Sequence, residues 1–234
     1  MAKPRPKRVH PSGRLTFRNN VRGPKAKDLP YRIAEDEALC WDELVPSTAG
    51  EVEIEIGCGK GSFLVAAADR RPGTFLLGVE AGPAYAEYCA DRARRQGLAN
   101  VFLVADDARL FLADTVPQGR IRRVHIYYPD PWPKWRHRKR RIFSAELPPL
   151  LHRVLEPGGE LLVATDNLRY FGEILAVLGE TPLLARAFDL EHDYGAEDPG
   201  LAFGPTNFSR KYQIEGRTLR TCAWRRVATE RDET

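Results

Sequence analysis

The sequence predicts a single α/β domain with a mostly parallel sheet and helices on both of its faces. From residue 51 onward, short runs rich in Val, Ile and Leu alternate with stretches of helical periodicity, and this alternation is typical of parallel sheets. The first two runs and the stretch between them form a βαβ unit. At 234 residues and 43% hydrophobic content, the chain is long enough to bury one core, and we expect no second domain.

A basic N-terminal arm is predicted for residues 1–28, ahead of a domain that covers residues 29–234. Nine Lys or Arg and no acidic residue precede Asp28, although the formal charge of the whole chain is only +4. A segment so poor in large apolar side chains cannot offset the entropy of ordering, so we expect the arm to be mobile. It fits a solubilising tail and an RNA-contacting arm equally well.

Composition also limits the compartment and the chemistry of the protein. No stretch approaches the roughly 18 apolar residues of a membrane-spanning helix, and the N-terminus lacks the apolar core of a signal peptide. We therefore expect a cytoplasmic protein with no membrane partner. The four cysteines are scattered, without a CxxC pair or paired histidines, so we expect reduced thiols and no metal site.

Hydrophobic periodicity and breaker residues define the elements in order. A first helix is predicted at 33–44, where apolar residues recur at helical spacing until Pro46. The predicted strands cover 52–56, 74–79, 101–104, 124–128 and 161–164, followed by a late pair at 183–190 and 219–227. The other predicted helices cover 63–69, 83–95, 110–114, 143–155 and 168–178.

Acidic residues recur where the predicted strands end. In open α/β sheets, ligands bind beyond the carboxyl ends of the strands. Each acid by itself could be a helix cap or a strand exit, but the whole set converges on one edge of the sheet. The set comprises Glu55 inside the first of these strands, and then Glu80, Asp106, Asp107, Asp130 and Asp166 after the next four.

A glycine loop follows the first strand of the βαβ unit and predicts a cofactor site. Gly57, Gly59 and Gly61 allow a tight turn and a close backbone approach to an adenosine-containing cofactor. Glu80 is placed to accept hydrogen bonds from ribose hydroxyls, which also fits NAD. The loop lacks the third glycine of the dinucleotide pattern, and S-adenosylmethionine suits the carboxylate-rich edge better because its sulfonium and amine are cationic.

A basic, indole-bearing stretch follows the strand at 124–128. The prolines around Asp130 hold this residue out of both helix and strand. Charge runs are often only solvated faces, but cations interleaved with planar side chains also match RNA. We expect Trp132 to be a core anchor that holds the loop and Trp135 to be exposed. The predicted RNA contacts are Trp135, Arg136, Arg138, Lys139 and Arg140.

With these motifs in view, the chain resembles the bacterial tRNA (guanine-N7)-methyltransferase family. The resemblance covers about residues 51–220 and is carried by EIGCGKG, GVE, YPDPWPKWRHRKRR and ATDN, of which the third is the most specific. It implies a Rossmann-like class I methyltransferase sheet of seven strands with a reversed C-terminal hairpin. It also implies S-adenosylmethionine as methyl donor and the N7 of a guanine in the tRNA variable loop as acceptor.

The resemblance also assigns roles to particular residues. It implies cofactor contacts for Glu55, Glu80, Asp107 and Asp130, and substrate contacts for Lys134, Asp166, Thr206, Asn207, Phe208 and Ser209. At the last of these positions the family usually has a glutamate, in the pattern Thr-x-Tyr-Glu. The replacement by serine removes a carboxylate that could hold the guanine edge.

The expected chemistry needs no general base. Guanine N7 carries a lone pair and no proton, so catalysis should rest on proximity and electrostatics, with Asp130 orienting the reactants. The alternatives are another RNA base methyltransferase, a non-catalytic RNA-binding protein that keeps the cofactor pocket and, more distantly, a nicotinamide oxidoreductase. The expected partner is tRNA, and the sequence leaves monomer and homodimer open.

Overall fold

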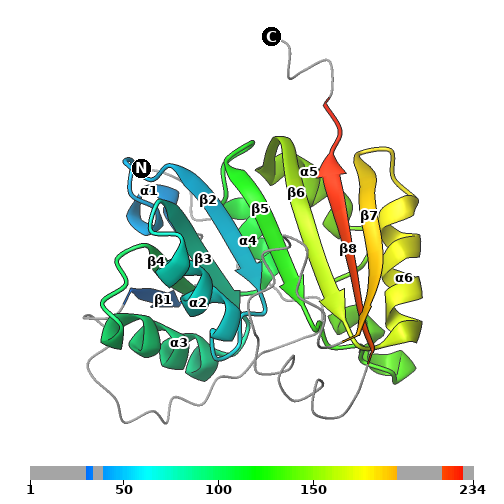
Figure 1. The fold of residues 1–234 in the computed structure, drawn as a ribbon, viewed down its shortest axis with the longest axis horizontal. Coiled ribbons are helices and arrows are strands. Elements are labelled where there is room, and N and C mark those ends of the chain that lie inside the picture. Colours follow the sequence, from blue (N-terminus) through cyan, green and yellow to red (C-terminus); the bar gives the residue numbers. More distant parts are fainter. Residues whose placement is uncertain (1–29, 34–38, 194–217, 229–234) are drawn as a thin grey trace, which may run out of the picture.

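The computed structural model of the protein describes residues 30–33, 39–193 and 218–228 (Figure 1). Within these residues the chain forms one sheet of eight strands in the order β1-β4-β3-β2-β5-β6-β8-β7. The strands are β1 (Tyr31–Ile33), β2 (Glu51–Ile56), β3 (Thr74–Glu80), β4 (Val101–Ala105), β5 (Ile121–Tyr127), β6 (Leu155–Thr165), β7 (Leu184–Asp193) and β8 (Thr218–Arg226).

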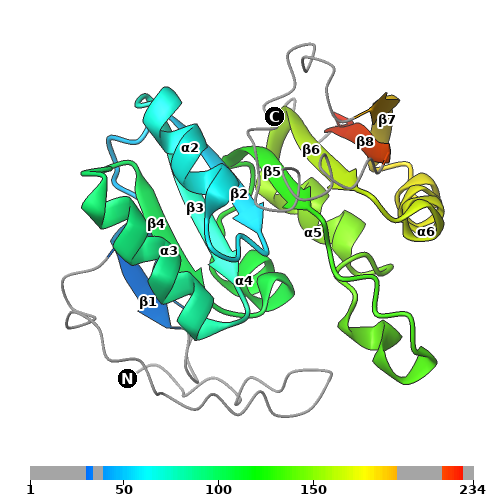
Figure 2. The ribbon, with the colours of Figure 1, turned by 60° about the horizontal axis from the view of Figure 1, so that its bottom comes forward.

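Helices cover both faces of this sheet (Figures 1 and 2). Buried residues of α1, α4, α5 and α6 pack on one face, and those of α2 and α3 pack on the other. The helices are α1 (Trp41–Leu44), α2 (Ser62–Arg70), α3 (Pro83–Arg95), α4 (Ala108–Asp114), α5 (Leu147–Val154) and α6 (Leu168–Gly179), with a 3₁₀ helix η2 (Trp135–Arg140).

The predicted α/β class and parallel sheet are confirmed, with two corrections. The sheet has an eighth strand because β1 adds to the edge, pairing parallel with β4 from Tyr31 opposite Leu103 to Ile33 opposite Ala105. The predicted helix over 33–44 is therefore wrong at its start, since Ile33 belongs to a strand and the described helix is only Trp41–Leu44. The reversed C-terminal hairpin is confirmed, because β8 runs antiparallel to both β6 and β7.

The predicted helix over 143–155 is also shorter, spanning only Leu147–Val154 as α5. Pro148 and Pro149 lie in its first turn, which is where a helix tolerates proline, because a first-turn N–H needs no partner inside the helix. The chain enters β6 immediately at Leu155. The register between β5 and β6 then shifts between Ile121 and Arg123, opposite the segment with Pro157, Gly158 and Gly159.

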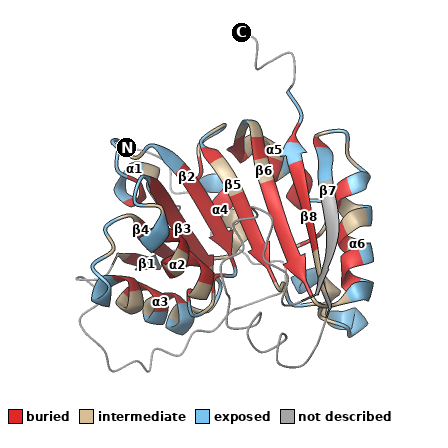
Figure 3. Ribbon diagram, in the orientation of Figure 1, coloured by how far each residue is buried: buried red, intermediate tan, exposed pale blue. Residues whose placement is uncertain are grey.

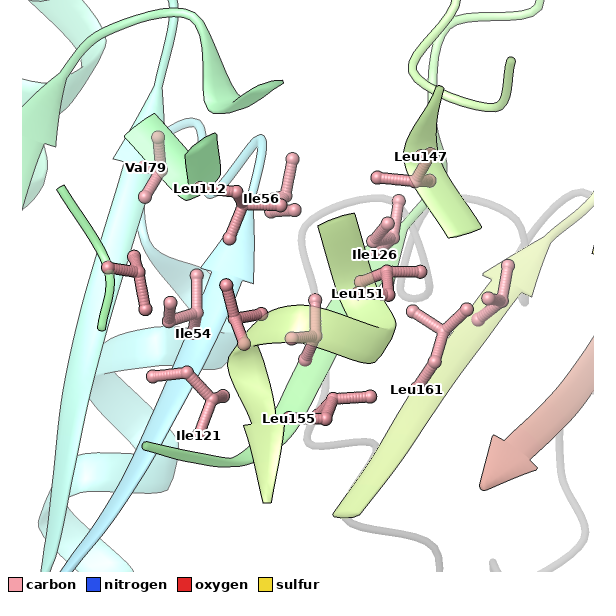
Figure 4. Close-up of a cluster of buried hydrophobic side chains, with 14 of the residues drawn as sticks. Ile54, Ile56, Val79, Leu112, Ile121, Ile126, Leu147, Leu151, Leu155 and Leu161 are labelled. Carbon is pink, nitrogen blue, oxygen red and sulfur yellow. The ribbon is translucent and has the colours of Figure 1, made fainter. Parts of the chain in front are cut away.

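The larger core lies between the sheet and the helices α1, α4, α5 and α6. The strands are the most deeply buried elements, as Figure 3 shows. On this face Ile54 of β2, Ile126 of β5 and Leu161 of β6 meet Leu151 of α5 (Figure 4). All four are at most 1% exposed, so the middle of the sheet is a packed and rigid support for the loops at its carboxyl edge.

Candidate active site

The site lies where the central strands end. Strand β2 has β3 on one side and β5 on the other, both parallel to it, so the connections after β2 and β5 leave the sheet in different directions. This is the topological switch point at which open α/β sheets bind ligands. The structure places the loops that carry Glu80, Asp107, Asp130 and Asp166 along this one edge, as the sequence predicts.

The glycine loop is tied to the end of β3 by Glu80. One carboxylate oxygen of Glu80 accepts a hydrogen bond from the Gly59 N–H at 2.9 Å, and the other accepts from the Gly82 N–H at 2.8 Å. A carboxylate has about four acceptor positions, so this side chain keeps capacity for two ribose hydroxyls. The loop needs glycine: Gly61 has a φ of 71°, and a Cβ there would lie 2.0 Å from the Cys89 Sγ.

Glu55 is buried beneath this loop, with 4% of its surface exposed. Its Oε2 has no hydrogen-bond partner among the described residues. Burial, and then the nearby Cys89 and Glu80, raise the pKa of the Glu55 carboxyl well above its ordinary value. A buried acceptor of this kind is costly when it is left alone, and a cationic ligand group beside it would offset that cost. Glu55 and Glu80 together therefore fit an adenosine cofactor that carries a positive charge.

The acid at the edge after β4 also caps a helix, whereas after β6 an amide beside the acid does so. Asp107 caps α4, because its Oδ1 accepts from the Arg109 N–H at 2.9 Å. After β6 it is Asn167, next to the half-buried Asp166, that caps α6 by accepting from the Tyr170 N–H at 2.9 Å. Capping uses a single oxygen of Asp107. The cap fixes this side chain at the end of its strand.

Asp130 is exposed on a loop whose backbone is strained at both ends. Tyr128 has a φ of 52° and Trp132 a φ of 36°, in the left-handed region that costs a bulky residue about 1–3 kcal/mol. Arg141 supports this loop: its Nε donates to the Pro131 carbonyl at 2.6 Å and its Nη2 to the Trp132 carbonyl at 3.3 Å. Arg141 thus acts as a clamp on the loop.

The same guanidinium is anchored to α6. Its Nη1 pairs with Glu173, and its Cζ lies 5.0 Å from the centre of the Tyr170 ring. The Arg141 side chain is only 10% exposed. Of the basic residues in this stretch, Arg141 is therefore part of the scaffold, a role that its position in a charge run gave no sign of.

The rest of the basic stretch forms an exposed projection between β5 and α5. Lys134 precedes η2, which carries the other predicted RNA contacts. Trp135 is 79% exposed, with Arg138 stacked 5.0 Å from its ring centre, so its predicted exposure is confirmed. Trp132 is half-buried and packs within the loop. Its ring centre lies 5.5 Å from that of His137 and 5.0 Å from the Arg140 Cζ. The expectation that Trp132 is a core anchor is therefore wrong.

A buried polar network that the sequence did not reveal joins the two central strands. His125 Nε2 lies 2.9 Å from a Glu53 oxygen and its Nδ1 lies 2.7 Å from the Tyr127 hydroxyl. Burial alone would raise the pKa of Glu53, but hydrogen bonds from His125 and Arg71 outweigh it and hold that pKa at about 2. The ionised carboxylate can only accept, so Nε2 carries the proton and Nδ1 accepts from the phenol.

This network extends across the sheet on the α2 and α3 face. Arg123 on β5 donates to Glu53 at 2.9 Å and to Glu160 on β6 at 3.2 Å. Arg225 on β8 then donates to Glu160 at 2.9 Å. Opposite charges thus alternate over four neighbouring strands, which locks β2 against β5 below the site. Glu53 on β2 and His125 and Tyr127 on β5 share one face of the sheet, but nothing in their sequence spacing predicts that they meet.

One part of the predicted site lies outside the described part of the chain. The substrate segment with Thr206, Asn207, Phe208 and Ser209 lies outside the described residues. Among the residues that are described, no group of His, Cys, Asp or Glu is arranged to hold a metal ion. None of the helices described is long and apolar enough to cross a membrane.

The sheet order, the reversed hairpin and the glycine loop under an acidic edge define a class I methyltransferase. A solved structure titled as an antibiotic-related methyltransferase superposes with a TM-score of 0.60 at 14% identity, covering 81% of this chain and 96% of that one. A 16S rRNA methyltransferase gives 0.59 at 15% identity, covering 80% and 92%. At these identities the likeness establishes the fold.

Sequence relatives define the family more narrowly. The family described as "Putative methyltransferase" matches residues 49–222. A curated tRNA (guanine-N(7)-)-methyltransferase of Acidithiobacillus ferrooxidans is 36% identical over 74% of this chain and 75% of its own length. One of Geobacter metallireducens is 39% identical over 50% of this chain and 56% of its own length. The chain belongs to the tRNA (guanine-N7)-methyltransferase family.

Proposed function

We propose that the protein transfers a methyl group from S-adenosylmethionine to N7 of a guanine in tRNA. The observation that carries this proposal is the pairing of two features at one sheet edge. A buried carboxyl at Glu55, whose Oε2 has no hydrogen-bond partner among the described residues, underlies the glycine loop. An exposed basic loop with an outward indole holds Asp130. The first feature suits a cationic methyl donor, and the second suits an RNA chain.

The chain's own residues would hold the reactants rather than exchange protons with them. S-adenosylmethionine supplies, when bound, an electrophilic methyl group on a sulfonium. Glu80 would accept from the ribose and Glu55 would balance the cationic end, while Gly57, Gly59 and Gly61 let the backbone approach. Guanine N7 offers a lone pair and loses no proton, so no residue has to act as a base.

Asp130 is the residue that we propose to face the reacting base. Its carboxylate would orient the guanine and balance the positive charge that develops on the purine as N7 is alkylated. Asp166 would contact the base edge and Lys134 an RNA phosphate. Asp107 would contribute a carboxylate oxygen to the cofactor, and the segment from Thr206 to Ser209 would complete the substrate side.

Substrate and cell compartment are linked in this proposal. We place the protein in the cytoplasm because that is where a tRNA substrate is found.

We also treat residues 29–234 as one domain. Support for a single domain comes from the described sheet, in which all eight strands are hydrogen-bonded in one continuous order. The basic arm at 1–28 would add non-specific attraction for RNA.

The decisive test is a methylation assay with bulk tRNA and labelled S-adenosylmethionine, followed by nucleoside analysis. We expect 7-methylguanosine from the wild-type protein and at least a 100-fold lower kcat from Asp130→Ala, with cofactor affinity retained. Asp69→Ala, which removes an exposed aspartate from the far end of α2, is the matched control. Methylation of an exocyclic amine would identify a different RNA methyltransferase. RNA binding without any transfer would identify a non-catalytic protein.

Phosphate contacts by the basic loop have their own signature. The affinity for tRNA should fall steeply with salt, because each neutralised phosphate releases counterions. We expect log Kd to change with log salt with a slope of about 0.7 to 0.9 per contact. A flat response between low and moderate salt would remove phosphate binding from the proposal.

A further inference from the structure

The exposed large apolar side chains of the described residues gather at the edge that holds the site. Four of them follow the carboxyl ends of parallel strands: Tyr85 (52% exposed) and Tyr88 (49%) after β3, Trp135 (79%) after β5, and Leu168 (59%) after β6. Of the exposed apolar side chains in the described ranges, only Val227 (37%) lies at the opposite edge. It follows β8, which runs in the reverse direction (Figure 1). The proposed function gives no role to the two tyrosines of α3.

These tyrosines belong to a small aromatic and cationic surface, which we name the α3 patch: Lys60, Tyr85, Tyr88 and Arg92. The three helical residues are spaced i, i+3 and i+7 and so share one face of α3. Lys60, from the glycine loop, places its Nζ 5.8 Å from the centre of the Tyr88 ring. Arg92 donates to the Lys60 carbonyl at 3.4 Å, so loop and helix form one surface.

Tyr85 connects the α3 patch to the cofactor loop. A Cβ at Gly82 would lie 3.1 Å from the Tyr85 Cδ2, so the ring packs directly on the backbone of that glycine. The Gly82 N–H in turn donates to Glu80 at 2.8 Å. The aromatic surface therefore borders the proposed cofactor site, with Glu80 between them.

The acidic side chains of α3 do not neutralise the patch. Asp91 pairs with Arg94 at 2.9 Å and with Arg95 at 2.8 Å. Glu87 lies near Tyr31 of β1, where burial, followed by this carboxylate, raises the pKa of Tyr31 to about 12. Neither cation of the patch takes part in an ion pair among the described residues, so its charge is available to an anionic partner.

We infer that the α3 patch binds the RNA chain of the tRNA substrate, as a second contact across the sheet edge from the basic loop after β5. Half-exposed phenol rings beside uncompensated cations match the two needs of a single-stranded RNA segment, which are faces for stacking and charge for phosphates. Figure 2 shows α3 and the projection between β5 and α5 at opposite ends of this edge, with the end of β2 between them. The inference rests on the proposed function.

The test measures tRNA affinity in variants of the α3 patch. Tyr85→Ala with Tyr88→Ala should raise the Kd for tRNA by about tenfold or more, since loss of one stacked base is worth roughly 5- to 150-fold. Tyr88→Phe keeps the ring and should bind tRNA like the wild type. Lys60→Ala and Arg92→Ala should each lower the salt slope by about one phosphate contact. Arg120→Ala and Val227→Ala remove an exposed cation and an exposed apolar group from the opposite edge and should change neither quantity.

Cofactor affinity, measured separately by calorimetry, distinguishes the possible outcomes. The double tyrosine variant should bind S-adenosylmethionine with unchanged affinity and should lose tRNA affinity. Weaker cofactor binding with an unchanged Kd for tRNA would overturn the inference and assign the tyrosines to the cofactor site. Unchanged binding of both would overturn it as well, leaving the patch to a protein partner. In either case the wild-type protein would still form 7-methylguanosine, so failure here is distinct from failure of the proposed function.

Discussion

Replacement of Arg141 is the sharpest test of how this fold builds its site. The side chain lies in a run of cations that the sequence associates with RNA, yet it is 10% exposed and bonds to two carbonyls of the loop that carries Asp130. If it is a clamp, Arg141→Ala should impair the chemical step. If it were an RNA contact, the same change should impair RNA binding.

The expected size of the effect follows from the contacts that are lost. Two hydrogen bonds are worth about 1 kcal/mol each, the partly exposed pair with Glu173 up to about 1 kcal/mol, and the stacking on Tyr170 about 1 kcal/mol. Together they amount to about 3–4 kcal/mol, comparable with the strain of the left-handed Tyr128 and Trp132, at about 1–3 kcal/mol each. Without the clamp the loop should relax, and a 2 kcal/mol penalty for its competent form would lower kcat about 30-fold.

The assay compares Arg141→Ala and Arg141→Lys with the wild-type protein in kcat, in KM for tRNA and in the salt slope of tRNA binding. Both variants should show the lower kcat, because lysine keeps the charge but cannot reach two carbonyls as a fork. The salt slope should stay at its wild-type value. A wild-type kcat combined with a raised KM and a slope reduced by one contact would refute the clamp.

Three further outcomes are expected. Because its folded pKa is raised, the contribution of Glu55 to stability is full below its unfolded pKa and is lost as the pH rises through the folded value. Glu55→Gln should therefore be the more stable protein in cofactor-free urea unfolding at pH 8 yet bind S-adenosylmethionine more weakly, and equal affinity would contradict the role. Glu53, with a folded pKa of about 2, contributes about 3 kcal/mol to the free energy of unfolding above pH 4.3, and this contribution is lost toward pH 2. The acid unfolding of Glu53→Gln should lack this loss. A plot of stability against pH parallel to that of the wild type would count against the His125 network. Gly61→Ala forces a Cβ toward the Cys89 Sγ at a φ of 71°. Urea unfolding should therefore show a stability lower by about 2–4 kcal/mol, and adding Cys89→Ala should restore part of it. An unchanged midpoint would show that the loop can move aside.

Much of the fold could be predicted because its signals are local. The parallel strands, most of the helices and the glycine turn follow from side-chain periods and turn chemistry within a few residues of each other. Even the corrected start of α5 had a local signal in Pro148 and Pro149, which only the first turn of a helix tolerates. Strand β1 had no such signal, because three residues carry no period and the strand exists only by pairing with β4.

The sequence by itself determined the fold class, the acidic edge and the exposed indole, since strand polarity brings every strand end to the same side of a parallel sheet. Only the tertiary structure decided which charged groups belong to the scaffold. Glu53 meets His125 across 72 positions and Arg141 meets Glu173 across 32, and such distant pairs leave no trace in local pattern. Burial and hydrogen-bond partners then decide their chemistry. A carboxyl group is held ionised at Glu53, beside three donors, and is driven toward protonation at Glu55.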